Sequence, residues 1–135
     1  NDRMADHLDR LGLDYSVTFE DDLSVSITDR GKKVTAISGG EEERLAMALN
    51  WAFRDVFEDI HGIRMTFMGI DERLDAALDD DGADAAIKIL EENALDRGRT
   101  VWLITHKREF LDYTDQVLRL IRTGGGYSTM EWRTQ

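Results

Sequence analysis

The apolar and polar positions of the chain follow two different spacings, one typical of strands and one typical of helices. Residues 15–19 and 23–27 alternate apolar and polar side chains on either side of an acidic turn, which predicts a β-hairpin with one solvated face. Residues 41–60 repeat apolar side chains every three or four positions, which predicts a long core helix with a broad apolar stripe. Mostly apolar runs at 63–70 and 100–105 are typical of buried strands, and we expect these two strands to be parallel.

The remaining segments fit around this pattern. Residues 4–12 have helical spacing and end at a glycine, residues 83–95 predict a second long helix, and residues 107–114 predict a short one. Two further strands are expected at 117–121 and 127–132, joined by a glycine-rich hairpin turn. The sequence therefore predicts an α/β fold, with parallel strands, flanking helices and β-hairpins toward both ends of the chain.

The stretch ISGGEEER at residues 37–44 turns an extended segment through two glycines into the long helix. Ser38 and Glu41 have the spacing of a capping box, in which each side chain bonds to the backbone amide of the other residue. Gly39 and Gly40 lack a Cβ, so a ligand could approach their amides closely. The free N–H groups and the dipole of a helix start favour an anion, above all phosphate. An ordinary capped turn has the same features, so the stretch alone leaves both interpretations open.

Candidate chemistry follows both apolar runs. Asp71 and Glu72 come directly after the first run, at the carboxyl end of a predicted strand, where open α/β sheets place their ligands. One carboxylate could hold a hydrated Mg²⁺ while the other faces an attacking water. His106 follows the second run, level with these carboxylates on a parallel sheet. A solvated strand end and a structural histidine are the simpler alternatives.

Composition narrows the class of protein. The 135 residues suit one domain, and the net charge of −11 argues against a DNA-binding surface on this chain by itself. The absence of cysteine excludes disulfides and thiolate metal sites. No apolar run is long enough to span a bilayer, so we expect no membrane contact and a cytoplasmic location. The first residue is Asn1 rather than methionine, which suggests a processed product or a piece of a longer protein.

Taken in order, four segments resemble the motifs of an ABC-type ATPase head of the SMC and SbcC kind. ISGGEEERLAMAL is similar to the signature motif, MTFMGIDE to the Walker B strand with its glutamate, LDAALD to the D-loop and LITH to the switch histidine. The resemblance spans residues 37–106. It implies the C-terminal lobe of such a head, in which residues 1–13 end a coiled-coil helix, residues 14–37 form a β-hairpin region and residues 38–135 carry the motifs.

Two departures refine the resemblance. Arg73 and Leu74 follow the Walker B glutamate, where transporter ATPases usually have Pro and Thr, and the chain contains no proline. The interval from Asp71 to Asp79 is also one residue longer than in common ABC heads. Both features are similar to the ATPase subunits of bacteriophage recombination endonucleases, which are relatives of SbcC. A phage-encoded protein of this kind would work in the cytoplasm of the host.

The resemblance implies roles for the motif residues, with ATP and Mg²⁺ as cofactors. Asp71 would hold Mg²⁺ through water, Glu72 would polarise the attacking water and His106 would sense the γ-phosphate. Asp75 and Asp79 of the D-loop would cross the interface between two heads. The signature residues would bind the ATP held by the opposite subunit, and they are Ser38, Gly39, Gly40 and Glu41.

The resemblance also implies partners. The sequence has no G-x-x-x-x-G-K-[ST] loop to cradle the phosphates, so an N-terminal ATPase lobe that carries this Walker A motif is expected as the first partner. The others are a second copy of the head in an ATP-driven homodimer, a nuclease subunit, and DNA through the complete complex. We therefore expect this chain alone to bind ATP poorly and to hydrolyse none.

The function that the resemblance implies is half of an ATP-hydrolysing head in a nuclease complex for DNA double-strand-break repair and recombination. ATP would close two heads and hydrolysis would release them, which would regulate the processing of DNA ends. One alternative is an SMC or RecF-like DNA-clamp ATPase, and another is a structural module that keeps the fold without hydrolysis. The presence of Glu72 and His106 favours hydrolysis, since a structural module would need neither.

Overall fold

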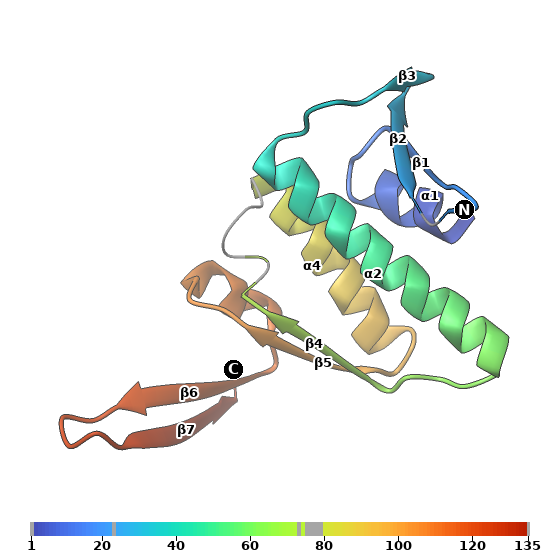
Figure 1. Cartoon of the computed structure of the whole chain (residues 1–135). Helices are drawn as coiled ribbons and strands as arrows, with labels where there is room; N and C mark the ends of the chain where they lie inside the picture. The colour runs from blue at the N-terminus through green and yellow to red at the C-terminus, as the bar shows by residue number, and fades with distance from the viewer. Residues whose placement is uncertain (1, 23, 73, 75–79, 135) are drawn as a thin grey trace. The chain divides into compact units, whose positions relative to one another are not determined.

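The computed structural model of the chain describes residues 2–22, 24–72, 74 and 80–134 (Figure 1). The chain divides into two compact units, Asn1–Ile104 and Thr105–Gln135. The motifs at Ser38 and Asp71 both lie in the first unit. Among the described residues, none of the helices combines the length and the apolar character that a membrane crossing needs.

The first unit begins with a short helix and a small antiparallel sheet. Helix α1 (Asp2–Arg10) is followed by β1 (Tyr15–Phe19), β2 (Val25–Asp29) and the two-residue strand β3 (Lys32–Lys33). The strands lie in the order β1-β2-β3, with neighbours antiparallel. The predicted hairpin is therefore confirmed.

Helix α2 (Gly39–His61) is the long helix that the sequence predicts, and Gly62 ends it in the left-handed conformation with φ 63°. Its buried side chains differ from the predicted apolar stripe. Phe53 and Ile60 belong to the predicted stripe, yet Ile60 is 73% exposed and Phe53 is also exposed. The predicted core stripe is wrong for these positions, because the described elements cover another face of the helix. The buried side chains on that face are Met47, Ala48, Trp51, Ala52 and Asp55.

The strand that follows α2 pairs with a strand far along the chain. Strand β4 (Phe67–Asp71) lies parallel to β5 (Thr100–Ile104), so the predicted parallel pairing is confirmed. The first strand begins later than predicted. The reason is that both backbone groups of Met65 bond to side chains, its N–H to Glu58 and its C=O to Arg99, and not to a neighbouring strand.

One face of this two-stranded sheet is exposed. Met68 is buried on one side of β4, whereas Phe67 on the other side is 59% exposed and Trp102 of β5 is 45% exposed. The expectation of fully buried strands is therefore wrong within the first unit, because none of its described elements covers the second face. Parallel sheets are usually covered on both faces.

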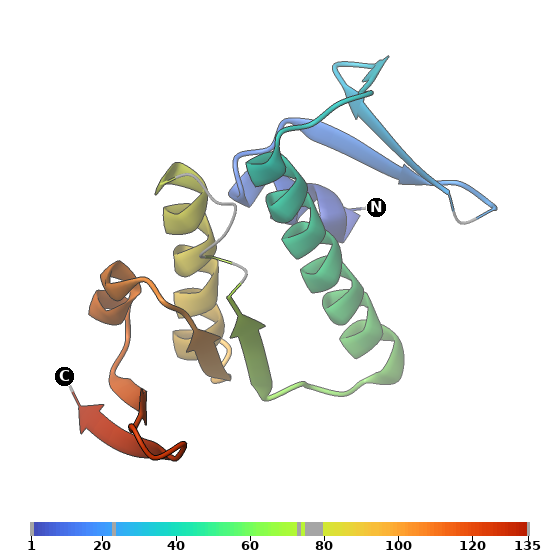
Figure 2. The ribbon, with the colours of Figure 1, turned by 60° about the vertical axis from the view of Figure 1, so that its left-hand side comes forward.

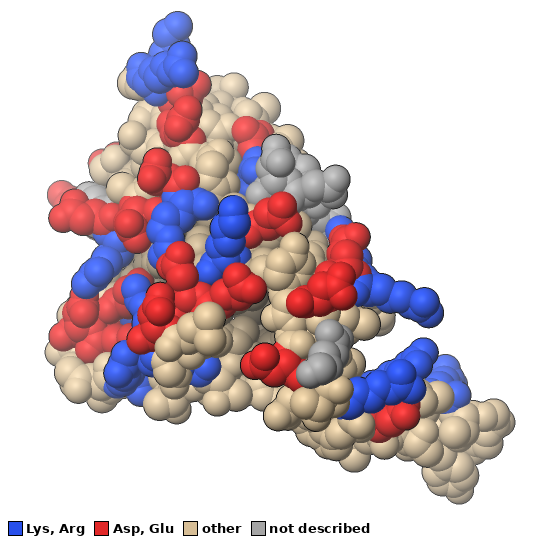
Figure 3. All heavy atoms as spheres, turned by 180° about the vertical axis from the view of Figure 1, so that it is seen from behind, with Lys and Arg blue, Asp and Glu red and all other residues tan. Residues whose placement is uncertain are grey.

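Helix α4 (Asp80–Leu95) completes the first unit. It begins three residues before the predicted start at Ala83 and buries an apolar side that includes Ala86, Ile87 and Leu90. Figures 1 and 2 show α2 and α4 running side by side along the β4–β5 pair. Side chains of both charge signs are interspersed over the face seen in Figure 3.

The second unit consists of a short helix and a hairpin. The 3-10 helix η1 (Arg108–Tyr113) precedes β6 (Gln116–Arg122) and β7 (Ser128–Thr134), which are antiparallel. The hydroxyl and the N–H of Thr123 both donate to the carbonyl of Tyr127, at 2.8 Å each. These bonds close the glycine-rich turn that the sequence predicts between the two strands.

Candidate functional site

The start of α2 has the geometry of a complete capping box. Ser38 has an extended backbone, and its Oγ accepts from the Glu41 N–H at 3.3 Å. The Glu41 carboxylate accepts in turn from the Ser38 N–H at 2.8 Å. The Glu42 N–H donates to the Ser38 carbonyl at 2.9 Å and begins the helical ladder. We call residues 38–41 the signature corner. Its shape is fixed by bonds within this chain.

A tyrosine from the N-terminal sheet braces the signature corner. The Tyr15 hydroxyl donates to Oε1 of Glu41 at 2.7 Å, while Oε2 receives the Ser38 N–H. The bond from the Ser38 backbone, with those from the Ser38 and Tyr15 side chains, lowers the pKa of Glu41 to about 2. The same bond to Glu41 raises the pKa of Tyr15. Glu41 is therefore an ionised brace, with both oxygens engaged. Sequence reasoning missed Tyr15, because a pair this far apart in sequence leaves no local pattern.

Gly39 has no conformational reason to be a glycine. Its φ lies outside the left-handed region, and a Cβ added there would meet nothing within 4 Å. A glycine in a helix costs up to about 1 kcal/mol relative to alanine, so no contact with the described residues favours it at this position. The first N–H groups of a helix have no acceptor within the helix. The position therefore suits close approach by a ligand from outside the chain.

The Ser38 hydroxyl lies at the same helix start. Its oxygen accepts from the Glu41 N–H and the Ser38 side chain also bonds to the Glu41 carboxylate, so the hydroxyl would have to turn to donate to a ligand. A phosphate oxygen needs donors and favours the positive end of a helix dipole. The signature corner thus fits a phosphate group chemically, and the acidic residue beside it is held by its own bonds.

The second candidate group lies at the carboxyl end of β4. Asp71 is the last residue of that strand and pairs with Ile104 of β5. The Glu72 N–H donates to the Ile104 carbonyl at 2.9 Å, which extends the contact between the strands by one residue. Glu72 has φ 50°, a left-handed conformation that costs about 1–2 kcal/mol in a residue other than glycine. Both carboxylates are exposed. Strain of this kind often marks functional positions.

A cavity of about 310 Å³ lies between the middle of α2 and the carboxyl end of β4. Asp71 lines this cavity beside the middle of α2, and Figures 1 and 2 show the start of α2 and the carboxyl end of β4 directed toward the same end of the first unit. Residues that line it include Ala46, Asn50, Arg54, Gly69, Ile70 and Asp71.

The donor set at Asp71 fits only part of a magnesium site. Mg²⁺ usually binds one or two carboxylates, and substrate phosphates and waters complete its coordination. Among the described residues, no group of three or more His, Asp or Glu side chains gathers to hold a metal ion. Asp71 can therefore supply one ligand, and the phosphates of a nucleotide would have to supply others.

Three predicted site residues are not placed against these groups. His106 belongs to the second unit, two residues after the end of β5, so its position relative to Glu72 stays a prediction. Asp75 and Asp79 of the predicted D-loop lie outside the described residues.

Two curated phage proteins are similar to this chain over most of its length. Exonuclease subunit 2 of Escherichia phage RB69 is 28% identical over 127 residues, which are 92% of this chain. Exonuclease subunit 2 of Enterobacteria phage T4 is 24% identical over the same length. The chain spans only 22% of each of these relatives. No family model matches the sequence.

Solved structures show the same architecture. An SMC ATPase studied for ATP-driven dimerisation and DNA-stimulated activation superposes with a TM-score of 0.76 and 19% identity, covering 98% of this chain and 82% of that one. The Smc head from Pyrococcus furiosus, bound to the C-terminal domain of ScpA, gives a TM-score of 0.72 and 19% identity over 98% of this chain and 34% of that one. The chain therefore has the fold of an SMC-type ATPase head and resembles bacteriophage exonuclease subunits in sequence, as the order of its motifs predicts.

Proposed function

We propose that this chain is the C-terminal half of an ATP-hydrolysing head in a nuclease complex that acts at DNA double-strand breaks. The observation that carries the proposal is the signature corner, a phosphate-compatible helix start built by Ser38, Glu41 and Tyr15. The carboxyl end of β4, at Asp71, is directed toward the same end of the unit as the start of α2. The likeness to phage exonuclease subunits supports the nuclease context.

The signature corner would act on ATP bound to a second copy of the head. The amides of Gly39 and Gly40 and the hydroxyl of Ser38 would donate to the γ-phosphate, and the dipole of α2 would favour its negative charge. Glu41 would keep the corner in shape through its bonds to Ser38 and Tyr15. ATP would thereby hold two heads together, and the loss of the γ-phosphate would release them.

Hydrolysis would depend on the end of β4. Asp71 would hold Mg²⁺ through water, and Glu72 would orient and polarise the attacking water. Bound Mg²⁺ supplies positive charge to the phosphate oxygens. His106 would donate to the γ-phosphate, and Asp75 and Asp79 would cross the interface between the heads. Positioning and charge account for most of the catalysis of phosphoryl transfer.

The first partner would be an N-terminal lobe that carries Walker A. The exposed sheet face with Phe67 and Trp102 supports this, because parallel sheets are normally covered on both faces. Further partners would be a second head, a nuclease subunit, and DNA through the complete complex, in the cytoplasm of a phage host. ATP binding would depend mainly on the N-terminal lobe.

A chromosome-organising or clamp ATPase is the second candidate function, and the superposition on SMC heads favours it. Precipitation of the complete protein from its native cell separates the two candidates. Recovery of a nuclease subunit supports the first function, and recovery of a kleisin-type partner supports the second.

The proposal is tested with this chain combined with the N-terminal lobe of its parent. Wild type is compared with Glu72→Gln, and Glu20→Gln in an exposed turn is the control. We expect Glu72→Gln to lower ATP turnover by about a hundredfold or more, because the water loses its base, while ATP-driven dimerisation persists. Absence of hydrolysis in the wild-type mixture, with the lobes associated, would favour the structural module instead.

A further inference from the structure

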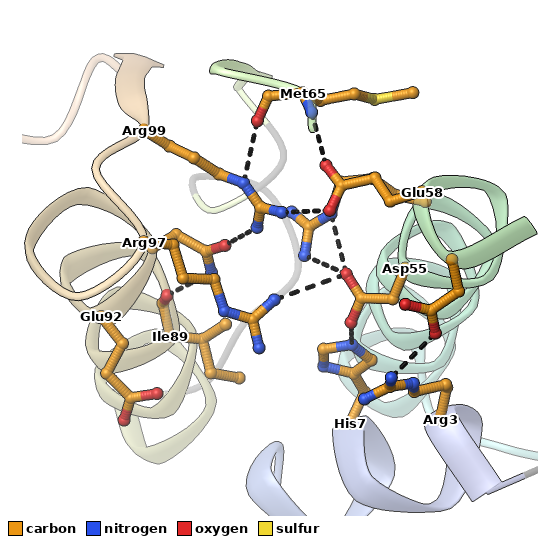
Figure 4. A network of polar contacts seen from close by, with 12 residues as sticks. Arg3, His7, Asp55, Glu58, Met65, Ile89, Glu92, Arg97 and Arg99 are labelled. Carbon is orange, nitrogen blue, oxygen red and sulfur yellow. Dashed lines mark hydrogen bonds and ion pairs between the residues drawn. The ribbon is translucent and has the colours of Figure 1, made fainter. Parts of the chain in front are cut away.

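A cluster of charged side chains lies along one side of the second half of α2 (Figure 4). At its centre, Asp55 is only 6% exposed. Oδ2 of Asp55 lies 2.9 Å from Nε2 of His7 on α1, and Oδ1 accepts from Arg54 at 2.8 Å and pairs with Arg97 at 3.6 Å. Burial by itself would raise the pKa of Asp55, but the bonds from His7 and Arg54 lower it overall. One carboxylate therefore joins α1, α2 and the turn before β5.

Glu58, one turn further along α2, makes a second set of contacts. It accepts from the Met65 N–H at 2.7 Å and from Arg99 at 2.5 Å. Arg99 also donates to the Met65 carbonyl at 3.0 Å and to the side chain of Asn93 on α4. Met65 precedes β4 and Arg99 precedes β5. Glu58 thus ties α2 to the start of both strands and, through Arg99, to α4.

These polar contacts hold a part of α2 that apolar packing does not. No described side chain after Asp55 in this helix is buried. Hydrogen bonds weaken steeply when distance or angle changes, so they define the direction of a helix more narrowly than an exposed apolar face does. We call Asp55 and Glu58, with their partners His7, Arg97 and Arg99, the polar joint.

The polar joint lies far from the signature corner but on the same helix. Ser38 and Asp55 are separated by about 26 Å along the helix at 1.5 Å per residue. A tilt of about 5° at Asp55 would move Ser38 by roughly 2 Å over that length. Misplacement by about 1 Å can already cost a hundredfold in rate. A small tilt of α2 at the polar joint would therefore displace the signature corner by enough to change the rate.

We propose that Asp55 and Glu58 are positioning residues, which set the place of the signature corner relative to β4 and pass movements of α1 to it through His7. The inference rests on the proposed function for its effect on ATP turnover. Its structural part, the control of the angle of α2, stands without that function. The test therefore measures the angle and the activity separately.

The angle is measured by the distance between two spin labels. The chain has no cysteine, so Glu42→Cys near the signature corner and Lys88→Cys on α4 introduce the only labelling sites. This chain is labelled and then combined with the N-terminal lobe. We expect Asp55→Asn to shift or broaden the distance distribution by about 2 Å or more.

Asp59→Asn is the matched control. Asp59 also links α2 to α1, through Arg3 at 2.8 Å, but its side chain is 60% exposed. Exposed pairs contribute little to stability, so we expect the label distance to stay unchanged. An unchanged distance in Asp55→Asn as well would overturn the proposal.

The second readout is ATP turnover by the combined lobes. We expect Asp55→Asn to lower kcat by about ten- to a hundredfold while KM for ATP stays within about twofold, because the corner acts on the bound γ-phosphate. A lower kcat with an unchanged label distance would overturn the proposal that Asp55 sets the angle of α2, and it would leave the proposed function intact. A changed label distance without any wild-type turnover would support the control of the α2 angle by the polar joint and contradict the proposed function. If Asp55→Asn does not fold, Glu58→Gln supplies the same outcomes, since it keeps an acceptor for Met65 and loses the charge that pairs with Arg99.

Discussion

The signature corner and the carboxyl end of β4 are both candidate parts of one ATPase, but this chain completes only the first. The corner is held by bonds within this chain, between Ser38 and Glu41 and from Tyr15 to Glu41. The strand end has Asp71 and Glu72 exposed, and the sheet face beneath them has no described cover. The difference is that the capping bonds of the corner join near neighbours in sequence, whereas the strand end needs partners from distant segments.

A helix start needs only a few neighbouring residues, so a short sequence can build it. A strand end in a parallel sheet needs other strands and helices, which come from distant segments. The corner should therefore keep its structure when the chain is alone, whereas the strand end should need the N-terminal lobe.

Gly39→Ala should separate stability from function most sharply. The new Cβ would meet no described atom within 4 Å, so the unfolding free energy should stay the same or rise by up to about 1 kcal/mol. The methyl group would block a phosphate at the corner, and turnover by the combined lobes should fall by about a hundredfold or more. Gly124→Ala is the control, since its Cβ also meets nothing within 4 Å and its φ is ordinary. Equal turnover in both variants would contradict the role of the corner.

Phe67→Ser tests whether the exposed sheet face receives the other lobe. Its ring is 59% exposed here, so the fold of this chain should change little. If the ring is buried between the lobes, its loss should weaken their association by about 2 kcal/mol, or roughly thirtyfold. Calorimetric titration of one lobe with the other measures this. Leu95→Ser, at an apolar side chain 80% exposed at the end of α4, should have no effect.

Tyr15→Phe removes the brace from the signature corner. We expect the unfolding free energy to fall by about 0.5–1.5 kcal/mol, measured by urea denaturation, because one hydrogen bond to Glu41 is lost. Carboxyl chemical shifts should also show a higher pKa for Glu41. Tyr113→Phe, at an exposed tyrosine of the second unit, is the control and should leave that pKa unchanged.

The stability that the capping box contributes should depend on pH. The pKa of Glu41 is about 2 in the folded chain, against an ordinary value of 4.5. Ionised Glu41 therefore stabilises the fold fully above pH 4.5, and this contribution is lost as the pH falls toward 2. Urea midpoints of wild type and Glu41→Gln should converge between pH 6 and pH 3. A constant difference across that range would show that the charge of Glu41 does not contribute.

The sequence predicts the elements well where local pattern decides them. The capping box, the alternating hairpin at Tyr15 and the parallel pairing of β4 and β5 are all confirmed. The order of motifs also predicts the fold of an SMC-type head, which the superpositions confirm. These features depend on near neighbours in sequence or on the order of elements.

The rest depends on contacts that no local pattern contains. Apolar spacing places Ile60 in the core, but the structure buries Asp55 on another face because His7 and two arginines pair with it. A pattern of apolar positions cannot predict that an aspartate is buried. The apolar composition of the two strands predicts that both of their faces are buried. In the structure, however, Phe67 is exposed. The roles of Glu72 and His106 stay predictions, because they depend on a nucleotide and on a second lobe.

A complementation measurement tests most directly whether the ATPase site is divided between this chain and the N-terminal lobe. ATP turnover is measured for this chain alone, for the N-terminal lobe alone and for the two combined in equal amounts. We expect turnover only in the mixture, since the chain has the signature corner and the carboxylates of Asp71 and Glu72 but no Walker A loop. Turnover by the pure chain would contradict it, because the β4 end would then form a complete site without a second lobe.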